Sequence, residues 1–431
     1  MSAKLGQGGF KIRNRKSNYD VVVVGGGTAG VAAAVGAADT GLRTLLIEKN
    51  PYFGGAVTHS SVLTFCGFFT QNDPYEQIVG GVGAKVLDEL KQLHVYHEPY
   101  RNPRSGNVIV LLDPEATKYA LDRIVLSSGA VPFLHCQVIG AVVENNEIQA
   151  IECYDHAGHF LVEASAFVDA SGEADLTVLA GGRVRLGNDN GEFQAGTLVM
   201  RIGGVAHHAD LSRDAMIRLI QEAKKNGETH LTKENGMILR LPGSNDVLAM
   251  FADESVNGLH SRSLTEAEIS ARRQAWSYFR LFQRSLPGFE KAYLVQTGPS
   301  IGIRETRHVV GEMTLRGEDI LNGVRYPDAV ARGGWPVEIH QKGAPAVYRH
   351  IRDKSFYDIP LKALKVANVR NLWCAGRIIS CDPIAFASAR VTGTAFATGH
   401  AAGVAAALYA GKGAADIEAV RKELIRQEAY I

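Results

Sequence analysis

A glycine-rich turn between an apolar run and a small-residue segment constrains this chain most. Residues 19–24 read Tyr-Asp-Val-Val-Val-Val, a run typical of a central parallel strand covered on both faces. The pattern G-x-G-x-x-G follows at residues 25–30, and the alanine-rich residues 29–38 favour a helix. Residues 43–47 then resume a strand. A strand, a helix and a strand within about 30 residues predict a parallel crossover unit.

The glycines of this turn have separate physical roles in a dinucleotide-binding unit. Gly25 permits the tight turn, Gly27 lets the backbone approach a pyrophosphate, and Gly30 lets helix and strand pack closely. The helix start offers N–H groups and a positive dipole to the phosphates. Glu48 ends the second strand 18 residues after Gly30, where a carboxylate accepts hydrogen bonds from ribose hydroxyls. An acidic residue there excludes a 2′-phosphate, so the expected ligand is FAD or NAD.

Two further features favour FAD over NAD. Gly54 and Gly55 follow Glu48 closely, and a glycine pair lets the backbone lie against a second, flat part of a ligand. Near the other end, residues 372–376 predict a strand running into a glycine turn, and residues 399–409 predict a small-residue helix. A second helix start would hold the far end of a long ligand.

Composition bounds the protein class. The net charge of +1 gives no field that attracts nucleic acid or an anionic membrane. The five cysteines form no C-x-x-C pair and no metal-ligand spacing, so we expect a cytoplasmic protein without a metal site. Residues 391–410 are apolar but rich in Ala and Gly and contain His400, which favours a packed internal helix over a membrane span. The oligomeric state stays open, with a homo-oligomer as one option.

The middle of the chain follows a different pattern. Strand-like stretches there mix with helices such as residues 264–284, where Ser263 and Glu266 fit a capping box. We therefore predict an α/β fold: a Rossmann-like FAD-binding domain of the glutathione-reductase type, with an inserted α+β substrate domain. The expected limits are a flexible tail at 1–18, a discontinuous FAD-binding domain at 19–185 and 351–431, and a substrate or cap domain at 186–350.

Three blocks carry a resemblance to a known family. Val21–Gly55, Val168–Asp175 and Leu372–Leu408 resemble the broad FAD-dependent oxidoreductase family related to the glutathione-reductase and fumarate-reductase flavoproteins. Shorter segments, 302–307, 335–340 and 357–361, also resemble it, whereas residues 186–297 match no family pattern.

The resemblance implies which residues meet FAD. The ADP half and the near edge of the flavin would contact Gly25, Gly27, Thr28, Ala29, Gly30, Glu48, Lys49, Gly54 and Gly55. Val138 would meet the adenine, Ala170, Ser171 and Gly172 the pyrophosphate, and Gly376, Arg377 and Asp382 the ribityl chain. Gly399, Ala402 and Gly403 would bring a helix N-terminus to the pyrimidine ring, where reduced flavin carries negative charge.

The substrate end offers fewer signals. Arg304 and Arg390 are candidates to clamp a carboxylate or stabilise an enolate, and each could equally form a structural ion pair. His340 is the best acid–base candidate, with a structural histidine as the alternative. His59 and Cys66 follow the Gly54-Gly55 turn, and either could carry a covalent flavin bond; we expect His59 to be catalytic and the FAD to be non-covalent. Tyr326 and Tyr348 are weaker candidates.

These expectations combine into one function. We expect a flavin-dependent dehydrogenase or oxidase that passes a hydride between a small organic substrate and the flavin N5 atom. Since no second G-x-G-x-x-G follows a strand, a built-in NAD(P)H domain is not expected, and oxygen or a carrier would accept the electrons. The alternatives are a reductase or isomerase of unsaturated carboxylic acids, and a protein that binds FAD structurally and acts through a partner.

Overall fold

A parallel sheet joins the two ends of the chain at the centre of this computed structural model, which describes residues 13–14, 19–102 and 105–431. Its inner strands are buried along their whole length, as the continuous apolar run at residues 21–24 predicts. The C-terminal strand pairs in parallel with the strand before Ala170, so segments from both ends of the chain form one sheet. The sheet order is β22 (Leu372–Cys374), β11 (Ala166–Asp169), β2 (Val21–Val24), β3 (Thr44–Ile47) and β7 (Val131–Phe133).

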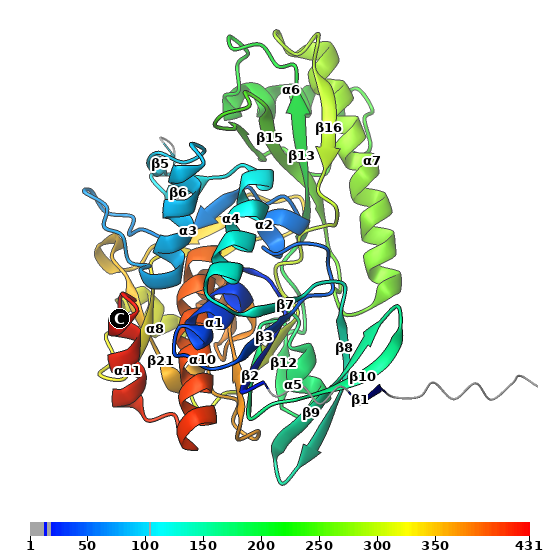
Figure 1. Ribbon diagram of the computed structural model, residues 1–431. Coiled ribbons are helices and arrows are strands. Elements are labelled where there is room, and N and C mark those ends of the chain that lie inside the picture. Colours follow the sequence, from blue (N-terminus) through cyan, green and yellow to red (C-terminus); the bar gives the residue numbers. More distant parts are fainter. Residues whose placement is uncertain (1–12, 15–18, 103–104) are drawn as a thin grey trace, which may run out of the picture.

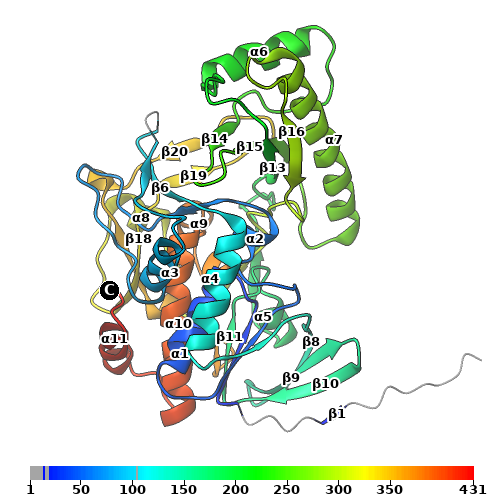
Figure 2. The same ribbon diagram turned by 45° about the horizontal axis from the view of Figure 1, so that its top comes forward.

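Two glycine- and alanine-rich helices lie side by side against this sheet (Figures 1 and 2): α1 (Thr28–Ala38) and α10 (Thr392–Lys412). A Cβ on Gly399 would meet the Ala29 carbonyl, and a Cβ on Gly403 the Ala33 carbonyl, in each case closer than the 3.0 Å that real Cβ atoms respect. The two backbones therefore touch, which only glycine allows.

The predicted start of the C-terminal helix at residue 399 is wrong. The helix begins at Thr392, so Gly399 lies two turns inside it. A glycine inside a helix resembles a boundary in sequence, but here it is the contact point for another helix. No helix in the described part of the chain is long and apolar enough to cross a membrane.

A second sheet packs into the same core, in the order β1 (Arg13–Asn14), β10 (Gly158–Glu163), β9 (Glu147–Asp155) and β8 (Gln137–Glu144). Strands β8 to β10 are antiparallel, whereas β1 pairs with β10 in parallel. Asn371, just before β22, ties it to the central sheet: its side chain bonds both the N–H and the carbonyl of Ile148, at 2.9 and 2.8 Å. Of the expected flexible tail at residues 1–18, only β1 is described; the remainder lies outside the described residues.

A second hydrophobic core forms in the middle of the chain, between residues 198 and 301. Its antiparallel sheet has the order β14 (Met237–Arg240), β15 (Val247–Glu254), β13 (Gly196–Gly203) and β16 (Tyr293–Thr297), with α6 (Arg213–Lys225) and α7 (Ser261–Ser285) beside it (Figure 1). The predicted α/β fold with an inserted α+β domain is thus confirmed, whereas the exact limits 186–350 stay a prediction.

The capping box predicted at Ser263 and Glu266 is wrong. Helix α7 begins at Ser261, after His260, and no side chain caps it. The Ser263 hydroxyl instead accepts a hydrogen bond from the Asn257 N–H at 3.0 Å, which fixes the incoming loop. The pattern of Ser and Glu three residues apart therefore marked the first turn of the helix but not its cap.

The remaining elements surround the central sheet. The short sheets are β4 (Thr64–Cys66), β6 (Val108–Leu111) and β5 (Tyr100–Arg101); β12 (Val184–Leu186) and β17 (Arg307–Val309); β18 (Ala329–Gly333) and β21 (Tyr357–Pro360); β19 (Val337–Ile339) and β20 (Val347–Arg349). The helices are α2 (Ala56–His59), α3 (Gly81–Gln92), α4 (Pro114–Ser127), α5 (Asp175–Leu179), α8 (Gly317–Asn322), α9 (Pro383–Ala389) and α11 (Ile417–Arg426), with single 3-10 turns at Arg352–Lys354, Leu361–Ala363 and Gly376–Ile378. Asp113 caps α4, and its side chain accepts hydrogen bonds from the N–H groups of Glu115 and Ala116.

The backbone contact between α1 and α10 predicts an asymmetry between two glycines of one helix. We expect Gly403→Ala to lower the free energy of unfolding by about 1–3 kcal/mol, because the new methyl group must push α1 away. Gly411→Ala is the matched control, since its Cβ would meet only Leu42, at 3.9 Å. The control should match or exceed wild-type stability, because Ala favours helix over Gly by up to about 1 kcal/mol. Thermal unfolding of the two variants measures the difference, and equal melting temperatures would contradict the packing argument.

Candidate active site

Predicted cofactor residues from four distant segments meet at one edge of the central sheet. Strands β2, β3, β11 and β22 are parallel neighbours, so their carboxyl ends lie together. In open parallel sheets, ligands bind beyond this edge. The segments that follow the four strands are 25–30, 48–49, 170–172 and 375–377, each of which contains residues that the resemblance implicates.

The glycine turn has the shape that a pyrophosphate needs. Gly25 adopts a φ of +98°, and a Cβ there or on Gly30 would overlap backbone atoms. Gly27 differs, because the atom nearest to its imagined Cβ is the Gly55 Cα, 3.8 Å away. Gly27 is also the N-cap of α1 and provides no side-chain cap, which leaves the N–H groups of the first turn for an anion. These residues fit the phosphates of a dinucleotide.

Glu48 lies where a ribose would bind. Its carboxylate is buried and accepts hydrogen bonds from the Gly26 N–H at 2.6 Å and the Asn50 N–H at 2.9 Å. Its carbonyl accepts a bond from the Cys136 N–H at 3.1 Å, which brings the start of β8, with Val138, beside β3. Lys49 is exposed.

Buried polar atoms without a hydrogen-bond partner lie just after the Gly54-Gly55 turn. Both ring nitrogens of His59 and the hydroxyl of Ser61 are buried, with no hydrogen-bond partner among the described residues. The His59 ring packs against Tyr52, with centroids 4.9 Å apart. Burial lowers the pKa of His59, while the neighbouring Glu48 acts to raise it. His59 therefore belongs to the cofactor side, beside the Gly54-Gly55 turn, and the structure does not bring it to the other catalytic candidates.

Four residues assigned to FAD by resemblance have other roles. Gly399 and Gly403 pack against α1 and, like the buried Ala402, lie well inside α10, so they cannot present a helix N-terminus. Asp382 caps α9: one carboxylate oxygen accepts the N–H groups of Ile384 and Ala385, and the other accepts that of Gly317 at 2.9 Å. Both oxygens thus have structural partners, and the contact of Asp382 with the ribityl chain stays a prediction.

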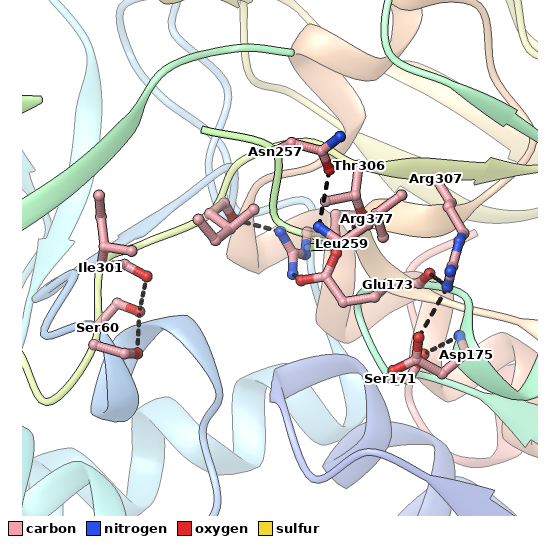
Figure 3. Close-up of polar contacts among 12 residues, drawn as sticks. Ser60, Ser171, Glu173, Asp175, Asn257, Leu259, Ile301, Thr306, Arg307 and Arg377 are labelled. Atoms are coloured by element: carbon pink, nitrogen blue, oxygen red, sulfur yellow. Dashed lines mark hydrogen bonds and ion pairs between the residues drawn. The ribbon is translucent and has the colours of Figure 1, made fainter. Parts of the chain in front are cut away.

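A strap from the second domain crosses the cofactor edge (Figure 3). The Ser300 N–H bonds the His59 carbonyl at 3.0 Å. Arg377, which follows β22, pairs with Glu173 and also donates to the Ile303 carbonyl. Arg307 binds Asp175 at 2.9 Å. Contacts along residues 298–307 therefore fix the second domain to the strand ends that hold the cofactor.

Beyond the strap, the chain brings together three of the predicted catalytic candidates. Ala195 links two of them: its N–H donates to the His340 carbonyl at 3.2 Å, and its own carbonyl accepts from Arg304. Arg304 also donates to the Thr197 hydroxyl at 2.9 Å. Arg390 approaches from the other side and donates to the Glu338 carbonyl at 3.2 Å.

Arg304, Glu338, His340, Tyr348 and Arg390 form one cluster, called here the Glu338 cluster. Glu338 is at its centre, although it was not among the predicted site residues. Its carboxylate accepts from Trp335 Nε1 at 2.8 Å and from the Tyr348 hydroxyl at 2.5 Å. It lies 3.1 Å from His340 Nε2 and 3.9 Å from Arg390. The only signal in the sequence was its place in the segment 335–340, which carried the family resemblance. Tyr326 is elsewhere, with its hydroxyl near Asp319.

The charges in the cluster are set by burial and by Glu338. Burial and Arg304 lower the pKa of His340 to about 3, against the opposing pull of Glu338. Burial raises the pKa of Glu338, but His340 and Arg390 outweigh it, so the pKa lies well below its usual range. At neutral pH a neutral imidazole therefore faces a carboxylate. Its Nε2 carries the proton toward Glu338, and Nδ1 is left as a proton acceptor.

Cys66 lies beside the cluster but is poorly suited to covalent attachment of the flavin. Burial and Glu338 raise the pKa of its thiol to about 12, and only a thiolate is a good nucleophile. Its N–H donates to the Thr392 hydroxyl at 3.1 Å, at the start of α10. Ile109, Trp335 and Val391 form a small apolar core against which Cys66 packs. This core gives the cluster one apolar wall.

The first turns of α10 connect the cofactor edge to this cluster. Thr392 contacts Cys66, and Arg390 precedes the helix. Thr398 accepts a hydrogen bond from the Gly376 N–H at 3.2 Å, at the end of β22. Six helical residues span about 9 Å, so one short piece of α10 contacts both the strand ends and Cys66 beside the cluster.

The position of Glu48 predicts its contribution to FAD binding. We expect Glu48→Gln to raise the Kd for FAD by about tenfold or more, because a charged acceptor for the ribose and for the Gly26 N–H is lost. Glu115→Gln, on an exposed side chain of α4, is the control and should bind FAD like the wild type. Fluorescence quenching on titrating the apoprotein with FAD gives both constants. Equal Kd values for the two variants would place the ribose elsewhere.

Parts of the chain are similar in sequence to known enzymes. The digeranylgeranylglycerophospholipid reductase of Methanocella arvoryzae is 30% identical over 161 residues, which is 36% of this chain and 40% of the relative. The NADH:fumarate oxidoreductase of Klebsiella pneumoniae is 34% identical over 106 residues, 25% of this chain and 11% of the relative. The 3-oxosteroid 1-dehydrogenase of Mycobacterium tuberculosis is 52% identical over 107 residues, 24% of this chain and 16% of the relative. The chain thus spans 40% or less of the length of each.

Among solved structures, a geranylgeranyl bacteriochlorophyll reductase-like protein of Thermoplasma acidophilum is 15% identical, with a TM-score of 0.47 over 96% of this chain and 84% of that chain. A flavin-dependent brominase is 14% identical, with a TM-score of 0.49 over 94% of this chain and 83% of that chain. The family described as FAD dependent oxidoreductase matches residues 20–428, nearly the whole chain. The protein is therefore a member of the FAD-dependent oxidoreductase family, and FAD is its cofactor.

Proposed function

We propose that this enzyme oxidises a small organic substrate bound between the cofactor edge and the cluster around Glu338. The observation that carries the proposal is the position of α10. Its first two turns contact Gly376 at the strand ends and Cys66 beside the cluster, so one rigid helix positions both sites. Bound FAD supplies hydride acceptance at its N5 atom. The protein's part is to orient the substrate, exclude water and move a proton.

His340 is the proposed proton acceptor. Its neutral imidazole has Nδ1 available, because Nε2–H points to the ionised Glu338, 3.1 Å away. Glu338 orients the ring and stabilises the imidazolium that forms when the substrate's proton is taken. Arg304 offers a cation where negative charge develops on a carbonyl or enolate oxygen. The apolar wall beside Cys66 limits access of water.

The reverse direction, reduction of an unsaturated carboxylic acid, is the second candidate. It is favoured by the two arginines of the cluster, which suit a carboxylate. One of the partial matches in sequence is named NADH:fumarate oxidoreductase, and fumarate is an unsaturated carboxylic acid. Both candidates use the same residues, and they differ in the direction of hydride transfer. In the first, the substrate donates the electrons and oxygen or a carrier accepts them.

Anaerobic mixing of the purified holoenzyme with candidate substrates separates the two. Loss of the yellow flavin absorbance on adding a saturated acid, alcohol or amine identifies a donor and supports oxidation. Return of the colour when an unsaturated acid is added to photoreduced enzyme supports the second candidate. If no metabolite of either class changes the flavin spectrum, FAD has a structural role and both candidates fail.

The role of His340 gives a test on rate. We expect His340→Gln to slow flavin reduction by the identified substrate by about 10²–10⁴-fold, because the proton acceptor is lost while the FAD contacts stay intact. His208→Gln, on an exposed side chain, is the matched control and should react at the wild-type rate. Stopped-flow absorbance measures both. A His340→Gln rate within threefold of wild type would exclude His340 as the base.

The charge state of His340 predicts the pH dependence of the same step. Because its pKa lies at about 3, the imidazole is already neutral above about pH 5. The rate of flavin reduction should therefore be independent of His340 ionisation between about pH 5 and 8, and should fall only as acidification approaches pH 3. Rates measured from pH 4.5 to 8.5 in wild type and His340→Gln test this. A wild-type limb near the ordinary histidine pKa of 6.5, absent from the variant, would contradict the assignment.

A further inference from the structure

A buried lysine of the second domain stands apart from the interactions described above. Lys233 lies in the loop between α6 and β14, and Tyr278 of α7 fixes its backbone. The Tyr278 hydroxyl accepts the Lys233 N–H at 2.6 Å and also lies 2.6 Å from the Lys233 carbonyl. The preceding Thr232 donates to Asp253 or Gln274, at 2.9 and 2.7 Å. This loop is therefore held in one conformation.

The ammonium group of Lys233 has no partner in the described part of the chain. Lys233 is 8% exposed, and none of its side-chain atoms forms a hydrogen bond or an ion pair with a described residue. An ammonium group without a partner, on a side chain that is largely buried, is a candidate to bind an anion. Burial and Arg304 lower the pKa of Lys233, whereas Asp253 and Glu338 act to raise it. These charged groups therefore lie within electrostatic range of the amine.

The loop that carries His340 touches the loop that carries Lys233. Gly343 donates its N–H to Asp253 at 2.9 Å, and a Cβ on Gly343 would lie 3.3 Å from the Thr232 carbonyl. Figure 2 shows the β19–β20 hairpin, which flanks this loop, reaching alongside β14. The loop that carries Lys233 thus contacts the loop between Ile339 and Val347 that includes His340.

The cations and anions around this point do not balance locally. Arg390 has Glu338 within 4 Å, whereas the Asp253 carboxylate accepts from two neutral groups, the Thr232 hydroxyl and the Gly343 N–H. Arg304 contacts only neutral acceptors, and neither it nor Lys233 has a described carboxylate at ion-pair distance. The three cations Arg304, Arg390 and Lys233 therefore share two carboxylates, Glu338 and Asp253, which leaves one positive charge in excess.

We propose that Lys233 and Arg304 together bind a carboxylate of the substrate. This inference rests on the proposed function, in which the cluster holds the reacting molecule, and it narrows the substrate class to organic acids. Arg304 can bind a carboxylate through two parallel N–H bonds, and Lys233 adds a point charge from another loop of the same domain. The carboxylate supplies a negative charge that both groups can share.

The test compares acids with their uncharged amides on the holoenzyme. Acetate, succinate and benzoate are titrated alongside acetamide, succinamide and benzamide, and both the flavin absorbance and the melting temperature are followed. The variants are Lys233→Met and the conservative Lys233→Arg. Lys342→Met is the matched control, since Lys342 lies nearby but is ion-paired with Glu254 at 2.6 Å. FAD content and the melting temperature without ligand confirm that each variant is folded.

We expect at least one acid, but not its amide, to perturb the flavin spectrum and raise the melting temperature. Lys233→Met should weaken that binding by about tenfold or more, Lys233→Arg should restore part of it, and Lys342→Met should leave it unchanged. The inference is overturned if no acid binds, if acid and amide bind equally, or if Lys233→Met binds the acid like the wild type. If an acid instead raises the melting temperature in a Lys233-dependent way without changing the flavin spectrum, the carboxylate site exists but does not lie beside the flavin. In that case the inference about Lys233 stands and the proposed function is wrong.

Discussion

The backbone contact between α1 and α10 is the constraint on which the rest of this structure depends. Gly399 and Gly403 have no side chain to separate α10 from the carbonyls of Ala29 and Ala33. The close approach lets β22 join the parallel sheet beside β11 and aligns the start of α10 with the strand ends. The chain thus uses two helices, from near its opposite ends, whose backbones touch without intervening side chains.

The cofactor-binding side of the site could be predicted from local sequence patterns. The apolar run at 21–24, the glycines of the turn and Glu48 lie within 30 residues, and their spacing follows from strand and helix geometry alone. The start of α10 was not readable, because a glycine inside a helix and a glycine at its end look alike until the partner helix is known. The helix-capping role of Asp382 was not predicted either, although a carboxylate before Pro383 suits a helix cap, which it forms here.

The substrate side resisted prediction because its residues are far apart in sequence and were brought together by tertiary packing. His340, Arg304 and Arg390 were selected singly by their chemistry, but Glu338, which joins them, lies in a short strand with nothing to distinguish it from a surface carboxylate. Lys233 lies in a stretch that resembled no family. Only its 8% exposure, in contrast to the usual solvation of lysine, singles it out.

The segment that runs through α9 into α10 couples the two halves of the site. Ser388 bonds the Trp335 carbonyl at 2.5 Å, Arg390 meets Glu338, and Thr398 meets Gly376. These contacts are made by about ten consecutive residues, so a shift of the helix against α1 would move the cluster and the cofactor edge together. Because the strap at 298–307 holds the second domain to the same edge, a substrate bound by both domains would be held in one fixed orientation toward the flavin. Catalytic geometry here is therefore a property of helix packing as much as of the polar residues themselves.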